Sequence, residues 1–491
     1  MIHNRTDVLA GLVGVGNLGS KAEAIPPADL LRLTLPHPAH INALAPDVIL
    51  VLGGRGAGKS HLFRLLNTPN GPEALDPERR SPYLHTSLWA TGFAAEAQKH
   101  RFPSELNFQA FAAGRSRTEL MGFWSGLLLG KLLLENTGQL GNQLELRLSP
   151  QLVGAFRKGL DRTSDWHPLV MSELESVSAT LDYLDDQLEA KAQYLFVTYD
   201  DLDVTAVEWN EKRALIQALL QFWLGQWRRW RRIRPKIFLR LDLFHPDFLQ
   251  FADASKLDGN KVTLRWTAHQ LYALTFKAWA NQNDPARAFI ENALNSSFIQ
   301  NQFLGWTFPA MPSADALRRV VHRMLGEFMG KDRKKGASFD WPPNHLQDAL
   351  GEIFPRLMLN LFSLAATDEL EFSRAPEDLL LAPESVSAGI ALVSERRLKE
   401  LLEEFPWLES VKPKLFGQRV PMVRSEMAAL LSTINEWGTT RPLNPEPEAV
   451  IEHLLRIGVF RIMPDRRIHV PDIYLYGFGL KRSGGIRRPK A

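Results

Sequence analysis

The sequence contains no cysteine among its 491 residues. That absence excludes disulfides, zinc sites built on thiolates and thiol catalysis, and it fits a reducing compartment. The 13 histidines do not fill the gap, because none stands in the H-x-x-x-H or HExxH spacing of a metal site. A serine-hydrolase motif of the G-x-S-x-G kind is also missing.

Long hydrophobic runs are missing as well. A membrane-spanning helix needs about 20 apolar residues, and the best candidate, 123–134, is interrupted by Lys131 and is typical of a core helix. The stretch 8–16 weakly resembles a signal peptide, but Asp7 and the glycines argue against secretion. We therefore expect a cytoplasmic protein with no membrane partner.

Charge of either sign is nearly balanced. The net charge of +3 is too small to indicate a nucleic-acid partner by itself. Its distribution is uneven, because the segment 461–491 holds eight basic and two acidic side chains. The hydrophobic content of 45% is ordinary for a folded protein, and the length allows two or three domains.

A complete phosphate-binding motif is present in the first third of the chain. It follows an apolar run of strand length, 48–52, and precedes the helical pattern 61–66, which is the context that a Walker A loop requires. Glycines let backbone N–H groups converge on phosphates, and the helix N-terminus adds positive charge. We expect Lys59 to reach the β- and γ-phosphates and Ser60 to coordinate Mg²⁺. The residues expected to bind ATP are Gly53, Gly54, Arg55, Gly56, Ala57, Gly58, Lys59, Ser60 and His61.

Two adjacent carboxylates follow a second apolar run, 194–199. Asp200 at a strand end is placed to hold Mg²⁺ through water, and Asp201 is placed to orient or deprotonate the attacking water. The alternative is a solvated pair that caps the next helix. Arg240, on the following strand, is a candidate sensor of the γ-phosphate, or else a surface residue paired with Asp242.

The order of elements predicts an α/β fold with a parallel sheet covered by helices on both faces. Strands are expected at 48–52, 83–89, 194–199, 236–241 and 262–266. The remainder is helical until two helices, 425–437 and 447–457, precede a two-stranded ribbon, as in a winged helix. We divide the chain into a segment packing on the ATPase core (1–44), the P-loop core (45–285), a helical lid (286–420) and a winged-helix domain with a basic tail (421–491).

The run 227–234 interleaves tryptophan with arginine and has two interpretations. Such residues stack on bases and pair with phosphates in nucleic-acid proteins. The run also ends a helix, where cations complement the helix dipole, which favours a solvated or inter-subunit face.

The segments 48–60, 200–203 and 237–242 (IFLRLD) together resemble the bacterial P-loop ATPases of the STAND, KAP and AAA-like groups, in particular those found in anti-phage defence islands. The resemblance implies ATP and Mg²⁺ as cofactors, homo-oligomers assembled under nucleotide control, and an effector protein as partner.

Two further functions stay open. The winged helix and the basic tail fit a DNA-binding, initiator-like or remodelling ATPase. A GTPase or metabolic kinase is disfavoured, because the segment 260–263 lacks the aspartate that reads guanine.

Overall fold

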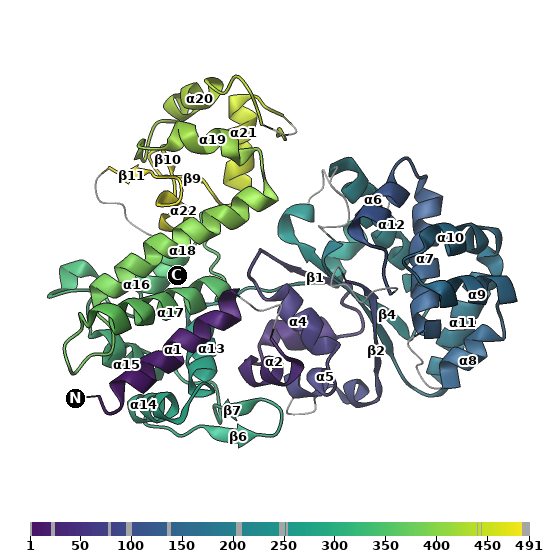
Figure 1. Ribbon diagram of the computed structural model, residues 1–491, viewed down its shortest axis with the longest axis horizontal. Helices are drawn as coiled ribbons and strands as arrows, with labels where there is room; N and C mark the ends of the chain where they lie inside the picture. Colours follow the sequence, from purple (N-terminus) through teal and green to yellow (C-terminus); the bar gives the residue numbers. More distant parts are fainter. Residues whose placement is uncertain are drawn as a thin grey trace. The chain divides into compact units, whose positions relative to one another are not determined.

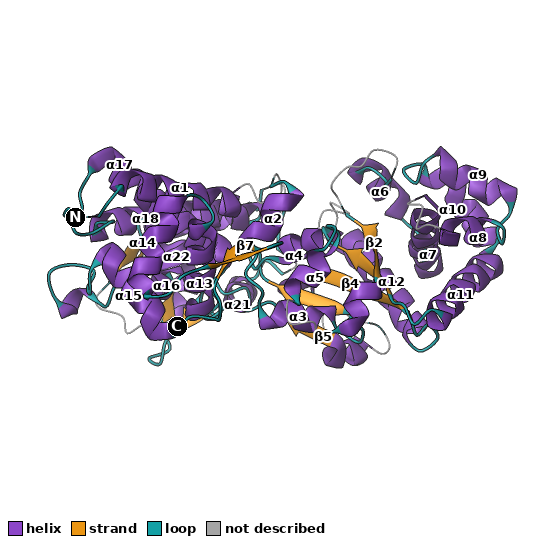
Figure 2. Cartoon of the chain, turned by 90° about the horizontal axis from the view of Figure 1, so that it is seen from below, coloured by secondary structure: helices purple, strands orange, loops and turns teal. Residues whose placement is uncertain are grey.

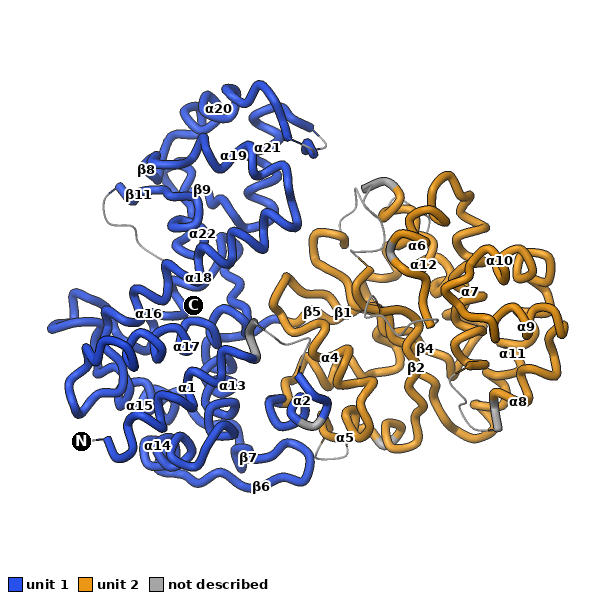
Figure 3. The backbone as a smooth tube through the Cα atoms, in the orientation of Figure 1, with its two compact units in different colours: residues 1–35, 265–491 blue, residues 36–264 orange. Residues whose placement is uncertain are grey.

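The computed structural model describes residues 2–20, 25–76, 80–94, 101–134, 139–202, 209–244, 251, 254–438, 440–442 and 444–483. Their contacts group the chain into two compact units. One is Pro36–Leu264, and the other combines Met1–Leu35 with Arg265–Ala491 (Figure 3).

Five parallel strands form the sheet of the unit Pro36–Leu264, in the order β2-β3-β4-β1-β5. Figure 1 labels β1, β2 and β4 of this sheet. The predicted parallel α/β core is confirmed. Because parallel strands end at the same edge, the residues that follow β1, β3 and β4 meet there. The strands are β1 (Leu50–Gly53), β2 (Leu88–Phe93), β3 (Leu195–Tyr199), β4 (Ile233–Arg240) and β5 (Lys261–Thr263).

Alternating side chains of the strands bury both faces of this sheet. Phe238 of β4 packs edge-on against Phe63 of α4 (Lys59–Leu66), with ring centroids 5.8 Å apart. Its neighbours Ile237 and Leu239 join the core cluster built on the opposite face by α7 (Arg117–Leu134) and α12 (Trp209–Trp227). Figure 2 shows the strands enclosed among these helices. The expected cover on both faces is confirmed.

A bundle of helices is inserted between β2 and β3. Its central helix, α7, is buried on nearly all sides, and its Gly126 lies so close to Trp166 that a Cβ there would approach the ring to 2.8 Å. Gly122 and Gly130 stand one turn away on either side, so this glycine stripe lets the neighbouring helices pack closely. The other helices of the insertion are α6 (Glu105–Ala112), α8 (Gln139–Glu145), α9 (Pro150–Lys158), α10 (Thr163–Ser172) and α11 (Leu174–Ala190).

The second strand differs from its prediction. The segment 83–89 was expected to be extended, but Pro82–Thr86 is a 3₁₀ helix and β2 begins only at Leu88. Proline suits the first position of a helical turn, because its φ is fixed and its missing N–H is not needed there. The aromatic residues of 83–89 indicated a strand, but Pro82 starts a helical turn, so the strand begins later than predicted.

The unit formed by Met1–Leu35 and Arg265–Ala491 is mainly helical. Near the start of the chain, α1 (Arg5–Ser20) packs along α17 (Pro355–Phe372). There the Ser363 hydroxyl donates a hydrogen bond to the carbonyl of Val13 at 2.8 Å. Gly16 permits this approach, since a Cβ there would collide with Ser363. The elements up to residue 404 are α1 (Arg5–Ser20), α2 (Pro27–Leu33), α13 (Ala268–Ala280), α14 (Asp284–Leu294), β6 (Ile299–Asn301), β7 (Gly305–Thr307), α15 (Ala314–Leu325), α16 (Trp341–Leu346), α17 (Pro355–Phe372) and α18 (Pro383–Glu404).

The boundaries of the two units differ from the predicted division. The helix α1 packs within the helical unit, whereas of the segment 1–44 only α3 (Pro38–Leu44) belongs to the sheet unit, where it contacts β5. At the other end α13, assigned to the core by its sequence position, is buried in the helical unit: the Tyr272 hydroxyl donates to the carbonyl of Phe339 at 2.7 Å. An apolar helix does not reveal from its sequence which neighbours cover it, so the compact unit 36–264 does not coincide with the predicted core 45–285. The predicted division of the chain, including the boundary at residue 420, stays a prediction.

The C-terminal segment has the connectivity of a winged helix. After α19 (Leu408–Leu415) and β8 (Arg419–Val420) come the two predicted helices, α20 (Arg424–Ser432) and α21 (Pro447–Arg456). The ribbon follows, with Ile468 of β10 opposite Ile462 of β9 and bridged to Met422. The predicted order of two helices followed by a two-stranded ribbon is confirmed, and the structure adds that the ribbon bridges back to Met422, just after β8. The last described elements are β9 (Arg461–Ile462), β10 (Ile468–His469), α22 (Asp472–Leu475) and β11 (Lys481–Arg482), which pairs with β8.

Among the residues described, none of the helices is both long enough and apolar enough to cross a bilayer.

Candidate ATP-binding site

The predicted Walker A loop connects β1 to α4 at the carboxyl edge of the sheet. Gly56 and Gly58 have φ of 84° and 98°, which favours glycine and turns backbone N–H groups toward the loop interior. A Cβ built on Gly58 meets nothing within 4 Å, so the space above this backbone is open. Gly58 is also the N-cap of α4, and the helix N-terminus faces the same space. The loop has the form that binds a phosphate chain.

Lys59 begins α4, and its ammonium group is held at the loop. Its Nζ donates to the carbonyl of Gly53 at 3.0 Å and to that of Gly54 at 3.1 Å. Arg55 and His61 are partly exposed on the loop and on the first turn of α4, as is expected of residues that border a ligand, while Ala57 is buried against the loop.

Asp200 follows β3 and reaches the P-loop helix. Its backbone N–H donates to the carbonyl of Phe93 at 3.1 Å, and its carboxylate accepts a hydrogen bond from the Ser60 hydroxyl. The carboxylate is buried, and its Oδ2 has no hydrogen-bond partner in the described part of the chain. Burial above all, and then the charge of Asp201, raise the pKa of Asp200 to about 7, while Ser60 and Lys59 oppose that rise. The structure thus brings together three residues that the sequence predicts to act together.

Asp201 is the next residue, and it is more exposed than Asp200. Its φ of 54° is a left-handed conformation, which is uncommon for a residue other than glycine and turns the chain sharply after β3. Such strain concentrates at functional sites. The third acidic residue of the cluster, Asp203, lies outside the described residues.

Arg240 ends β4 beside the loop. The register of the sheet pairs Arg240 with Gly53, the first residue of the Walker A motif. Its guanidinium forms a two-bonded ion pair with Asp242, with Nε–Oδ1 and Nη2–Oδ2 distances of 3.0 and 2.9 Å, and its side chain is 14% exposed. The pair with Asp242 is as the second interpretation expects, although Arg240 is mostly buried rather than on the surface, and its role as a sensor of the γ-phosphate stays a prediction.

The residues present fit a magnesium ion. Mg²⁺ is usually bound by one or two protein oxygens, with phosphate oxygens and waters completing its shell. The hydroxyl of Ser60 and the unpartnered Oδ2 of Asp200 are such oxygens, and they are adjacent. Over the described ranges no cluster of three or more His, Cys, Asp or Glu residues forms an independent metal site. An ion held by these two oxygens would take its remaining ligands from nucleotide phosphates and water.

A polar cluster behind the loop was not predicted. Asn67, just after α4, donates through Nδ2 to the Thr198 hydroxyl at 2.9 Å and accepts from the Thr91 hydroxyl at 3.0 Å. These bonds tie the end of α4 to β3 and β2, so they fix the P-loop helix relative to Asp200. Three isolated polar residues carry no pattern that would reveal their contact.

A buried histidine near the loop was missed as well. His40 of α3 is 3% exposed, and burial, followed by the charges of His37 and His61, lowers its pKa well below the ordinary value. His40 is therefore neutral beside the first turn of α4. The spacing of His37 and His40 in a short apolar helix gives no signal of this placement.

Comparison with known proteins adds little to this geometry. No protein-family model matches the chain, and no curated protein matches it. Among solved structures, the ORC2 protein of Aeropyrum pernix in ADPNP–ADP complexes is 14% identical over 93% of this chain and 92% of that chain, with a TM-score of 0.35.

Two other structures are similar at the same level. The ORC1 protein of Aeropyrum pernix in complex with DNA is 13% identical over 91% of this chain and 93% of that chain, with a TM-score of 0.34. Cdc6p from Pyrobaculum aerophilum is 12% identical over 97% and 93%, with a TM-score of 0.28. A likeness this distant carries no conclusion about what this chain binds.

Proposed function

We propose that the unit Pro36–Leu264 binds ATP with Mg²⁺ and hydrolyses it. The observation that carries this proposal is the contact between Ser60, at the end of the phosphate-binding loop, and Asp200, whose second carboxylate oxygen is buried without a partner. A glycine-rich turn with no ligand has no reason to bury an unsatisfied carboxylate beside it, because such burial costs free energy.

The residues of the site divide the chemistry among them. The loop N–H groups and Lys59 bind and orient the phosphates, and Ser60 and Asp200 would hold the ion, which supplies positive charge to the developing negative charge of the reaction. Asp201, the more exposed carboxylate, orients the attacking water and takes its proton. Arg240 stabilises charge on the γ-phosphate from the adjacent strand end.

We further propose that hydrolysis serves regulation. The support is the size of the helical unit, Met1–Leu35 with Arg265–Ala491, which is longer than the helical part of a small kinase. Nucleotide exchange would control self-assembly and an effector protein in the cytoplasm, and a ligand shifts such an equilibrium only through different contacts in the two states. The role in anti-phage defence rests on the family resemblance alone.

Replacing Lys59 by alanine tests the switch. We expect hydrolysis to fall by roughly 10²-fold or more, since a phosphate-binding cation is lost, and the ATP-dependent change in assembly to disappear. Size-exclusion chromatography with light scattering, with and without Mg-ATP, measures this. Lys158→Ala, at an exposed position at the end of α9, is the control and should behave as the wild type. Assembly that is identical in wild type and Lys59→Ala, with or without ATP, would refute nucleotide control.

The second candidate function is duplex DNA binding, and the winged-helix connectivity favours it. The structure limits how DNA would be contacted. The second helix of the pair, α21, exposes Glu448 and Glu452, and its N-cap residue Glu446 is exposed as well. Arg424 of α20 is already paired with Glu448 and Glu452. This face repels phosphates, so the wing between β9 and β10, with exposed Arg466 at φ 64°, is the surface that fits them.

The basic tail contributes less than its composition suggests. Arg467 is paired with Asp465, and Arg482 is paired with the buried Asp472. Arg461 is partly buried, and burial lowers its pKa. The residues beyond 483 lie outside the described part of the chain.

The variant Arg466→Glu tests DNA binding through the wing. We expect its affinity for duplex DNA to fall and the slope of log K against log salt to shrink by about 0.9, the value of one phosphate contact. Glu452→Gln should instead strengthen binding, because it removes charge that opposes the phosphates. Fluorescence anisotropy across a salt series measures both, and equal affinity in all three proteins would rule out this surface.

A further inference from the structure

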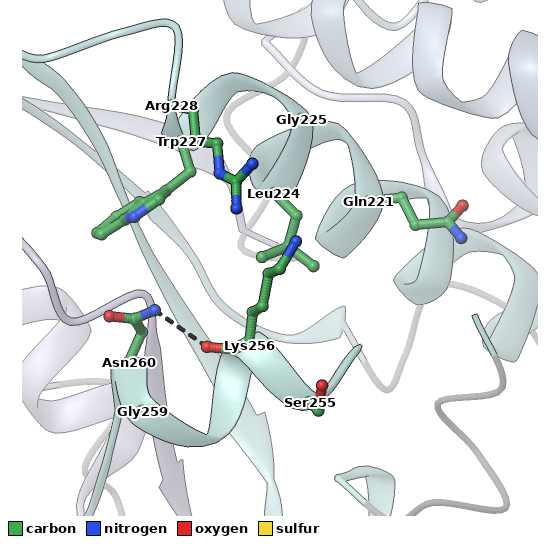
Figure 4. A pocket seen from close by; sticks show the side chains of 9 residues that line it. All are labelled: Gln221, Leu224, Gly225, Trp227, Arg228, Ser255, Lys256, Gly259 and Asn260. Atoms are coloured by element: carbon green, nitrogen blue, oxygen red, sulfur yellow. Dashed lines mark hydrogen bonds between the residues drawn. The ribbon is translucent and has the colours of Figure 1, made fainter. Parts of the chain in front are cut away.

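A pocket of about 740 Å³ opens at the amino edge of the sheet, the edge opposite the ATP site. One wall is the end of α12, which leads into β4. The other is the 3₁₀ segment Ala254–Asn260, which leads into β5 (Figure 4). The pocket therefore includes the first two residues of the tryptophan–arginine run, Trp227 and Arg228, which the ATPase proposal does not use.

The run separates into paired and unpaired cations. Arg229 and Arg231 form ion pairs with Asp182 and Glu189 of α11, so their charge is compensated within the unit. Arg228 makes no ion pair with any residue that the structure describes, and it is exposed. All three arginines are exposed, as a solvated face predicts, and an inter-subunit role of the run stays a prediction.

The described lining of the pocket carries positive charge. Among the lining residues that the structure describes, Arg228 and Lys256 are the charged ones. In Figure 4 both side chains extend toward Leu224, from opposite walls. Gly225 and Gly259 leave room beside these cations, because a Cβ built on either meets nothing within 4 Å. Two cations beside open space are suited to a phosphate group.

An aromatic ring stands beside this charge. Trp227 is half-buried, and the guanidinium of Arg234 lies 4.5 Å from its ring centroid. Arg234 is itself fixed, because it donates to the carbonyls of Trp230 at 2.7 Å and Trp227 at 3.3 Å. The ring is therefore held in one orientation, with Arg234 covering one face.

We propose that this pocket binds a nucleotide unit of a single-stranded nucleic acid, with the phosphate on Arg228 and Lys256 and the base against Trp227. The volume lies within the roughly 300–1,000 Å³ of pockets that hold small organic groups. A single strand is favoured over a duplex, because only an unpaired base offers its face to an aromatic side chain. A free nucleotide offers the same phosphate and base, and competition between a strand and a mononucleotide distinguishes these two ligands. This site is independent of ATP hydrolysis.

The test measures the anisotropy of a fluorescein-labelled oligothymidylate with the full chain across a salt series. We expect Arg228→Ala/Lys256→Ala to bind at least tenfold more weakly at low salt. Its salt slope should be smaller by about 0.7, since the two cations hold one phosphate and each phosphate contact of a single strand contributes roughly that much. Arg231→Ala is the matched control: it removes one exposed cation of the same run outside the pocket and should leave the binding almost unchanged.

Competition identifies the source of the nucleotide unit. Unlabelled oligothymidylate that displaces the probe far better than dTMP supports a strand, and equal displacement by dTMP assigns the same pocket to a free nucleotide. Wild-type affinity in the double variant, an equal loss in Arg231→Ala, or better competition by duplex DNA would overturn the proposal. Lys59→Ala should bind the probe as the wild type does, because Lys59 lies at the opposite edge of the sheet. The test of this pocket therefore gives the same answer whether or not the ATPase proposal is correct.

Discussion

Replacing Asp201 by asparagine is expected to lower kcat for ATP hydrolysis by roughly 10² to 10⁴, the usual contribution of a general base. The substitution keeps the shape of the side chain. Asparagine also tolerates the left-handed conformation that Asp201 adopts at φ 54°, so the backbone turn after β3 should be retained. Only the capacity to take a proton from the attacking water is lost.

Binding should be unaffected by the same change. Because Lys59 and the loop bind the phosphates, Asp201→Asn should bind a fluorescent ATP analogue as the wild type does, and a phosphate-release assay should show the loss of turnover. Asp186→Asn, an exposed position on α11, is the charge-matched control. Wild-type turnover in Asp201→Asn would assign the base to another residue.

Replacing Asp200 by asparagine is expected to stop Mg²⁺-dependent hydrolysis and yet to stabilise the metal-free protein. The pKa of Asp200, about 7 when folded against an ordinary 3.8, means that the folded protein keeps a proton that the unfolded chain releases between these values. The free energy of unfolding therefore falls as pH rises from about 4 to 7, by a few kcal/mol in order of magnitude, and stays low above 7. Asparagine carries no charge and avoids this loss.

Hydrogen exchange of the β1 and β3 peptides measures the effect on the sheet itself, which is preferable to one melting curve for a chain of two units. Without metal, the amides of β1 and β3 in the wild type should be less protected at pH 8 than at pH 5.5, after correction for the intrinsic rate at each pH. In Asp200→Asn these amides should stay protected at pH 8. Mg-ATP should slow exchange in the wild type only. A variant that is less protected than the wild type at both pH values would show that the carboxylate is satisfied in the metal-free protein.

Local patterns revealed the centre of the site. The Walker A loop is contiguous, and Asp200 is recognisable because it follows an apolar strand, so both could be placed before any contact was known. The same logic placed the winged helix, whose order of elements is its signature. In each of these features the residues that act together are neighbours in the sequence, so their spacing is enough to recognise them.

What could not be predicted depends on contacts between distant segments. Asn67 meets Thr198 only because β3 lies behind α4, and α13 has the same apolar pattern whichever unit buries it. The positive charge that the tail offers to a partner was overestimated for a related reason. Composition does not reveal that Arg482 forms an ion pair with the buried Asp472. Arg228 differs from Arg229 only in which residues lie opposite.

The strand order also determines when the site forms during synthesis. The strand β1 carries the P-loop, but its two neighbours in the sheet are β4 and β5, the last strands of the unit to be made. The helices of the insertion precede them and rely on local contacts, so they have the means to fold while β1 still lacks both partners. The nascent chain thus carries an exposed apolar strand with a phosphate-binding motif until residue 263 has emerged. A nucleotide bound at this loop would therefore stabilise the unit only after the final two strands have joined the sheet.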